Sequence, residues 1–233
     1  MRLFHSDSPR QALTVVLVAL GLLGSGCAPW HGNLLTGDYV TGEPYQPGNV
    51  YGQSWPFGPN LRRVAVLPLI TARTGSECGQ QALGSVLLDE LGQAKVFELA
   101  AVTPEQLEAW TGRKGWAASE VLPRELMSVL QEKLGCDAVL FSELTRFQPY
   151  PPLAVGWSLK LADLRSGEIL WAVDEVFDAG QPAVANGARR YAMKHAQLPG
   201  ALSDSRLILM TPTAFGHYSA EAIFSTMPPR HSS

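Results

Sequence analysis

Metal ligands and nucleophiles are scarce in this sequence, and those present are not grouped. The 233 residues include three cysteines and five histidines, and no two histidines have the spacing of a metal site. The motifs of serine hydrolases, nucleotide-binding proteins and zinc proteases are also absent. We therefore predict no catalytic residue, no metal and no cofactor. Each histidine of the mature chain is expected to lie on the surface or to have a partner within the fold.

An excess of charge of one sign is lacking as well. The chain has 18 Lys and Arg against 21 Asp and Glu, and no more than two basic residues are adjacent. Nucleic-acid binding by a basic face is therefore unsupported. Four acidic residues on expected strands could supply a catalytic carboxylate pair: Glu143, Asp163, Asp174 and Glu175. A solvated sheet face or a hairpin end explains them as well, and we favour that interpretation.

No apolar run at the N-terminus is long enough to span a membrane. Residues 12–24 form an uncharged stretch after Arg2 and Arg10, but a spanning helix needs about 20 apolar residues. A secretory signal peptide over residues 1–26 is the better interpretation. Gly24, Ser25 and Gly26 then lead into Cys27, and this stretch resembles the lipobox of bacterial lipoproteins, although Gly24 stands where Leu is usual. The alternative is an ordinary secreted protein in which Cys27 lies near the cleavage site by chance.

The lipobox resemblance implies that Cys27 becomes acylated, palmitate included, and is the first residue of the mature chain. Each buried methylene of an acyl chain contributes about 0.8 kcal/mol, so a multiply acylated cysteine anchors stably. The membrane is then the first partner of the protein, on the side away from the cytoplasm. Ala28 in place of an aspartate favours the outer membrane, with the domain facing the periplasm.

Residues 27–60 are predicted to be the lipid anchor followed by a tether. Residues 28–60 hold five prolines, six glycines and no Lys or Arg, which is typical of an extended or disordered segment. Their aromatic residues exceed what a spacer needs. Either they dock on the domain or on a partner, or they are interfacial residues near the lipid; we favour docking of the 50–57 end.

The rest of the chain predicts a single α/β domain with α+β character over residues 61–178. We expect a mixed sheet of about five strands, at 63–70, 95–100, 136–147, 154–163 and 168–177. The last two alternate and are predicted to form a hairpin with one apolar face, made of Val155, Trp157, Leu159, Leu161, Ile169, Trp171, Val173 and Phe177. Helices are expected from Ser76, from a capping box at Thr103 and Gln106, and from about 123 to a stop at Gly135. Residues 179–233 are predicted to be a C-terminal helical extension packed on the domain.

Cys78 and Cys136 are expected to stay free and mostly buried. Cys78 follows the first strand, whereas Cys136 precedes a strand expected to run parallel to it. A six-residue strand separates them by about 20 Å, while a disulfide tolerates about 7 Å between Cα atoms.

Two stretches carry a resemblance to a family: "GCDAVLFSELT" at 135–145 and "SGEILWA" at 166–172. With the elements around them they resemble a group of bacterial envelope lipoproteins over residues 62–178. That group includes the penicillin-binding-protein activator lipoproteins and the curli-secretion lipoprotein, and the N-terminal domain of the Tol-system propeller protein is similar in fold. The resemblance implies a small α/β domain that binds other envelope components, but it transfers no functional residue.

A lipid-anchored, non-enzymatic adaptor for an envelope protein is therefore the leading hypothesis. Residues that could contact a partner lie at the tether end and in the 111–116 loop: Trp55, Phe57, Arg113, Lys114 and Trp116. A plain solvated connection is the simpler interpretation of that loop. The alternatives are a subunit of a secretion-associated ring, which would make the protein a homo-oligomer, and an envelope small-ligand binder or hydrolase.

The anchor predicts the mass of the mature protein. Native mass spectrometry of protein extracted from its own envelope in mild detergent should give a chain that begins at Cys27 and carries acyl groups. An unmodified chain whose solubility does not depend on detergent would contradict the anchor.

Overall fold

The computed structural model describes residue 40 and residues 42–52, 56–71, 77–121, 123–196 and 204–229. Cys27 and Trp55 lie outside these residues, as does the side chain of Cys78. The elements follow one another in this order: β1 Val50–Gly52, β2 Arg63–Val66, β3 Ile70–Thr71, α2 Glu77–Ala94, β4 Glu98–Ala101, α3 Pro104–Thr111, α4 Arg124–Leu134, β5 Ala138–Gln148, β6 Ala154–Asp163, β7 Ile169–Asp178, α5 Pro182–Lys194, η1 Ser205–Met210 and α6 Pro212–Phe224.

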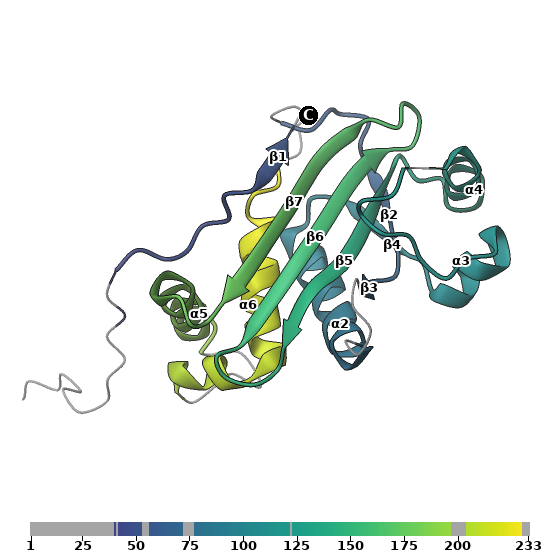
Figure 1. Cartoon of the computed structure of the whole chain (residues 1–233). Helices are drawn as coiled ribbons and strands as arrows, with labels where there is room; N and C mark the ends of the chain where they lie inside the picture. Colours follow the sequence, from purple (N-terminus) through teal and green to yellow (C-terminus); the bar gives the residue numbers. More distant parts are fainter. Residues whose placement is uncertain are drawn as a thin grey trace, which may run out of the picture. The chain divides into compact units, whose positions relative to one another are not determined.

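One mixed sheet organises the described part of the chain (Figure 1). Its strands lie in the order β1-β7-β6-β5-β2-β4, and β3 pairs with β5 outside this path. β2 is parallel to both β4 and β5, whereas β5, β6 and β7 are antiparallel. The expected α/β fold class with a mixed sheet is confirmed. The sheet has seven strands rather than about five, because the expected 63–70 strand is divided into β2 and β3 and the chain before the domain adds β1.

The first face of the sheet is covered by α2, α5 and α6 (Figure 1). Trp157 and Trp171 from the β6–β7 hairpin are fully buried there. Both indoles also have polar partners on the α6 side: Trp157 Nε1 donates to Ser219 Oγ at 2.9 Å and Trp171 Nε1 to Thr226 Oγ1 at 3.3 Å. The alternation expected for this hairpin is confirmed except at Ile169, which is exposed because the register shifts between Leu161 and Ala162.

The second face is covered only in part. A separate cluster, including Leu107, Trp116, Leu126 and Phe141, packs α3, α4 and the loop between them on β2, β4 and β5. Over β6 and β7 this face stays open, so that Lys160 is half-buried and Asp174 is exposed. The uncovered half of the sheet faces the viewer in Figure 1.

Several local predictions are confirmed. Thr103 caps α3, and its hydroxyl and the Gln106 side chain complete the capping box. Gly135 ends α4 with φ +61°, a conformation that costs little without a Cβ. Because β2 and β5 are parallel, Cys136 at the start of β5 is free and buried, as expected.

Residues 42–52, called the arm below, lie along β7 and α5 instead of remaining a free tether. β1 in the arm pairs antiparallel with β7. The Tyr45 ring contacts Phe177 edge-on at 5.4 Å, and its backbone N–H donates to Ala183 O. The edge strand β7 offers backbone groups with which the arm can pair. The composition of residues 42–52 alone does not reveal that such an edge is present. Of the 50–57 end, residues 50–52 and Phe57 are docked on the domain, and docking begins earlier than expected, at residue 42.

The contact between α5 and α6 predicts a stability difference between two glycines. A Cβ on Gly187 would overlap the Tyr218 hydroxyl, whereas a Cβ on Gly84 in α2 would meet nothing within 4 Å. We expect Gly187→Ala to lower the free energy of unfolding by about 1–3 kcal/mol through overpacking. The matched control, Gly84→Ala, should raise it by up to about 1 kcal/mol because alanine favours a helix. Denaturant unfolding measures both, and equal effects of the same sign would contradict this packing.

Candidate functional site

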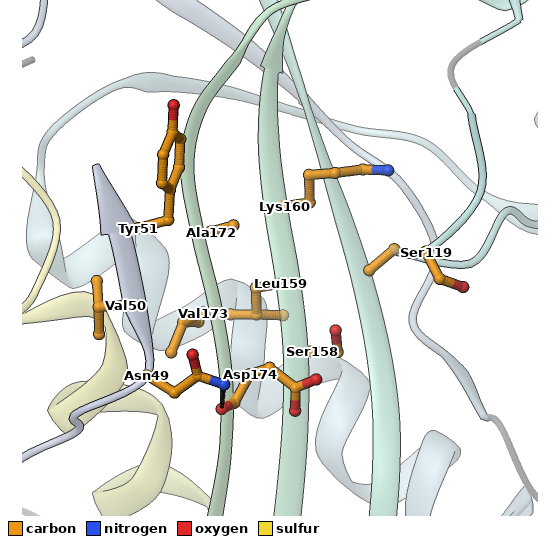
Figure 2. A pocket seen from close by; sticks show the side chains of 11 residues that line it. Asn49, Val50, Tyr51, Ser119, Ser158, Leu159, Lys160, Ala172, Val173 and Asp174 are labelled. Atoms are coloured by element: carbon orange, nitrogen blue, oxygen red, sulfur yellow. Dashed lines mark hydrogen bonds between the residues drawn. The ribbon is translucent and has the colours of Figure 1, made fainter. Parts of the chain in front are cut away.

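An open groove of about 320 Å³ lies on the uncovered half of the second face (Figure 2). The arm forms one wall, with Asn49, Val50 and Tyr51, and the α3–α4 loop forms the other, with Ala118 and Ser119. The floor comes from β6 and β7. Their lining residues are Ser158, Leu159, Lys160, Ala172, Val173 and Asp174.

The floor follows directly from strand geometry. Side chains alternate between the two faces, so the residues between the buried aromatic positions of the hairpin point to the second face. Ser158 pairs with Asp174, and Lys160 pairs with Ala172. Tyr51 of β1 continues the second row beyond Ala172. The groove therefore has a polar row beside a row that is partly apolar.

Lys160 is held against the loop wall. Its Nζ donates to the Glu120 carbonyl oxygen at 2.6 Å and lies 4.8 Å from the centre of the Phe141 ring. Burial lowers the pKa of Lys160, and the nearby Glu120 carboxylate partly offsets that effect. In Figure 2 the side chain extends from the floor toward Ser119. Its position is therefore fixed by contacts within the domain.

Asp174 differs from Lys160 because its carboxylate has no partner in the described part of the chain. Its backbone is well used: its N–H donates to Asn49 O, and its carbonyl oxygen accepts from Asn49 Nδ2 at 2.9 Å. The side chain is left exposed at the groove floor. It is an acceptor available to a group that enters the groove.

The loop wall is braced and is not a plain solvated connection. Arg113 donates to both carboxylate oxygens of Glu120, at 2.9 and 3.0 Å, and lies 4.7 Å from the centre of the Trp116 ring. The hydrogen bond from Arg113 and one from the Ala117 N–H hold the pKa of Glu120 below its usual value. Further along the loop, the Ala118 N–H donates to the buried carboxylate of Glu143 at 3.2 Å. These contacts fix the loop beside the floor.

The residues predicted to contact a partner do not form one site. Arg113 and Trp116 lie together, and Lys114 is next to them but pairs with Glu108 at 3.6 Å. Trp116 is buried, with an indole N–H that has no hydrogen-bond partner, so its role is to support the loop. Phe57 is 1% exposed and lies in the cluster on the first face, beside Phe97. Among the five, the exposed side chains in the described residues are those of Arg113 and Lys114.

Apart from Asp174, which was named as a carboxylate candidate, the groove residues were not predicted. The signal was present in "WSLKLAD", where Ser158 and Lys160 interrupt the apolar positions of β6. That pattern is typical of any half-solvated strand, so it does not indicate a site without the two walls.

The four acidic candidates for a carboxylate pair have structural roles or stand alone. Asp163 Oδ1 accepts from the N–H groups of Arg165 and Ser166 in the hairpin turn. The Glu175 carboxylate accepts a hydrogen bond from the Gly48 N–H in the arm, and the Glu143 carboxylate accepts one from the Ala118 N–H in the loop. The preferred interpretation agrees with Asp163 at the hairpin end and with the exposed Asp174, whereas Glu143 is buried and is not part of a solvated sheet face.

The two described histidines have carboxylate partners. His195 Nε2 lies 3.1 Å from Glu221 Oε2, and His217 Nδ1 lies 2.7 Å from Glu90 Oε1. This confirms the expectation of satisfied histidines for these two positions. Among the described residues no group of three or more His, Cys, Asp or Glu is placed to hold a metal ion. Burial also raises the pKa of the Cys136 thiol, which disfavours the thiolate.

No described helix has both the length and the apolar character needed to cross a membrane.

Comparison with known proteins finds likeness at the level of fold. No protein-family model matches the sequence, and neither does any curated protein. A PelC dodecamer structure from Paraburkholderia phytofirmans is 13% identical with a TM-score of 0.44, over 78% of this chain and 98% of that one. The lipoprotein GNA1162 from Neisseria meningitidis is 22% identical with a TM-score of 0.36, over 50% and 81%. The C-terminal domain of LpoB from Escherichia coli is 17% identical with a TM-score of 0.32, over 50% and 82%.

One of these neighbours, GNA1162, is itself named a lipoprotein. At such identities and TM-scores the likeness concerns the course of the chain, and it carries no statement about partner or activity.

Glu175 predicts a pH dependence for the arm wall of the groove. Burial alone would raise its pKa, but hydrogen bonds from Tyr45 and from the Gly48 and Asn49 N–H groups outweigh burial and hold the pKa below the usual 4.5. A carboxylate with a lowered pKa in the docked state stabilises docking above its free pKa, and this contribution is lost as the pH falls through the docked value. Arm docking should therefore weaken as the pH falls below about 4.5.

Hydrogen exchange of the Gly48 and Asn49 amides measures this, after correction for the intrinsic rates. Glu175→Gln should lower their protection about fivefold at neutral pH, since a hydrogen bond contributes about 1 kcal/mol. Glu168→Gln, an exposed residue in the turn before β7, is the control and should leave protection unchanged. Unchanged protection in Glu175→Gln would show that this carboxylate does not hold the arm.

Proposed function

We propose that this protein is a lipid-anchored, non-enzymatic adaptor of the bacterial cell envelope. In this proposal residues 1–26 are removed as a signal peptide, acylated Cys27 holds the chain in the outer membrane facing the periplasm, and the folded domain binds an envelope protein. The observation that carries the proposal is the half-open sheet face, where two walls fixed by hydrogen bonds frame the open groove beside an otherwise covered sheet.

The length of chain between anchor and domain limits where the domain can act. Fifteen residues lead from Cys27 to Gly42, the first residue of the arm. At up to about 3.4 Å per residue they span about 50 Å at most. A free segment over all of residues 27–60 would span a much longer distance. Docking of the arm shortens the free segment to the residues before Gly42. A partner must therefore lie close to the anchored membrane or extend toward it.

The chemistry of the groove favours a protein segment over a small substrate. The Lys160 amine is occupied by the Glu120 carbonyl, and Cys136, His195 and His217 are not among the lining residues. The lining combines the exposed Tyr51 ring and Ala172 with the partnerless Asp174 carboxylate. Aromatic rings beside a few placed polar groups are common in protein interfaces. We infer a partner segment that places apolar side chains on Tyr51 and a lysine or arginine near Asp174.

Arg113 and Lys114 extend the proposed surface along the loop. Both are exposed, at 51% and 66%, and they lie on the loop that forms one wall. The Lys114–Glu108 pair is a simple exposed ion pair, so its exchange for an acidic group on a partner costs little, whereas Arg113 keeps its bidentate contact with Glu120 and presents its outer edge. The proposal therefore keeps the prediction that Arg113 and Lys114 of the 111–116 loop contact the partner.

Site-specific photocrosslinking in cells tests the adaptor. A photoreactive phenylalanine analogue at Ser119, on the groove wall, should capture one envelope protein, whereas the same group at Tyr150, which is 77% exposed in the β5–β6 turn, should not. Ala172→Arg, which fills the floor, should reduce that capture at least tenfold without changing the unfolding midpoint. Tyr150→Arg is the matched control.

The outcomes separate the alternatives. Capture of a second copy of this chain from Ser119 would replace the adaptor by a homo-oligomeric ring. Equal capture from Ser119 and Tyr150, or capture that Ala172→Arg leaves intact, would remove the groove as the binding surface.

A further inference from the structure

The outward side of α5 carries basic and apolar side chains without acidic ones. Val184 and Gly187 face inward toward α6, and the opposite side, at helical spacing of three and four residues, presents Asn186, Arg190 and Met193. The sequence of α5 contains three basic residues and no Asp or Glu. Met193, near the C-terminal end of α5, is 40% exposed.

The short helix η1 extends this surface with two further apolar residues. Residues three apart lie above one another on a 3₁₀ helix, so Leu207 and Met210 share one side. They are 39% and 67% exposed, while Ile208 between them is buried. η1 is attached to α5, where Arg189 Nε donates to Ser205 Oγ at 3.3 Å. We call the surface formed by Arg190, Met193, Leu207 and Met210 the α5–η1 face.

The chain from the anchor enters the domain at this face. The Gly42 carbonyl accepts a hydrogen bond from Arg190 Nη2, and a Cβ on Gly42 would lie 3.2 Å from Asn186 Nδ2. In Figure 1 the purple segment that leads to β1 runs past α5. The acylated end of the chain is therefore connected to the domain next to Arg190, through at most about 50 Å of chain.

We propose that the α5–η1 face contacts the surface of the bilayer in which Cys27 is anchored. This proposal depends on the lipid anchor of the proposed function. Met193, Leu207 and Met210 would enter the headgroup region, and Arg190 would lie near lipid phosphates. The face combines one basic group, Arg190, with three large exposed apolar side chains, and both kinds of side chain favour the membrane interface. The attachment point and the short chain keep the face near the bilayer at high local concentration.

This orientation would leave the open groove free. α5 and η1 pack on the first face of the sheet, whereas the groove lies on the second. A domain that rests on the membrane through the first side presents its groove away from the contact. Membrane docking and partner binding therefore use different residues.

Vesicle binding of the mature chain with Cys27→Ser tests the face without a lipid anchor. The vesicles contain phosphatidylcholine and phosphatidylglycerol at three to one, and co-sedimentation gives the partition coefficient. Leu207→Ser with Met210→Ser should weaken binding about tenfold, because two apolar side chains no longer enter the interface. Val121→Ser, at an 89% exposed apolar residue elsewhere, is the matched control and should bind like the parent. Arg190→Glu should weaken binding to these vesicles and not to phosphatidylcholine alone.

Two results would overturn the α5–η1 face. One is a parent chain that does not bind these vesicles, and the other is a double variant that folds and binds like Val121→Ser.

Hydrogen exchange of the acylated protein on vesicles distinguishes failure of the α5–η1 face from failure of the lipid anchor. If the acyl mass is present but α5 and η1 exchange as they do in solution, the anchor stands and the face is wrong. If Cys27 carries no lipid and the parent chain still binds vesicles, the face stands and the anchor is wrong.

Discussion

The unequal covering of the β6–β7 hairpin is the constraint on which the rest of this structure depends. One side of the hairpin buries Trp157 and Trp171, and both indole N–H groups donate to hydroxyls on or just after α6. Buried indoles need such partners, so they fix α6 against the sheet while their large apolar surface drives the packing. The strand period of two then sends Ser158, Lys160, Ala172 and Asp174 to the other side. The hairpin residues between the buried apolar ones therefore form its second face, which combines polar and apolar side chains.

The second face becomes a candidate site only because two distant segments border it. The arm reaches the edge of β7 from the N-terminal side, and the α3–α4 loop reaches β6 from the opposite direction. In both cases a carboxylate on the sheet accepts backbone N–H groups: Glu175 accepts those of Gly48 and Asn49 in the arm, and Glu143 accepts that of Ala118 in the loop. Docking of the arm also covers much of the β7 edge, which would otherwise be free to pair with another chain. Docking of the arm therefore shapes one wall of the groove and, in the proposed function, also limits the reach of the domain from the membrane.

In the proposed arrangement, membrane docking and partner binding are compatible because the α5–η1 face and the groove lie on separate parts of the domain. The chain arrives beside Arg190 on α5, the exposed Leu207 and Met210 extend that side, and the groove occupies the opposite face of the sheet. Under these proposals, binding energy from the lipid and from the α5–η1 face would orient the domain without using the groove. An adaptor built this way is pre-oriented for its partner, which reduces the rotational freedom lost on binding.

The sequence by itself determined the features that depend on neighbours in the chain. Alternation in 154–163 and 168–177 predicted the hairpin, Thr103 and Gln106 predicted a helix start, and Gly135 predicted a helix end. The cysteine at the end of an apolar run predicted the anchor. Only the tertiary structure decided that Phe57 and Trp116 are buried, that residues 42–52 attach to β7, and that Ser158, Asp174 and Tyr51 line one groove. The physical reason is that strand and helix periods act over a few residues, whereas burial and wall formation depend on which distant segment covers each face.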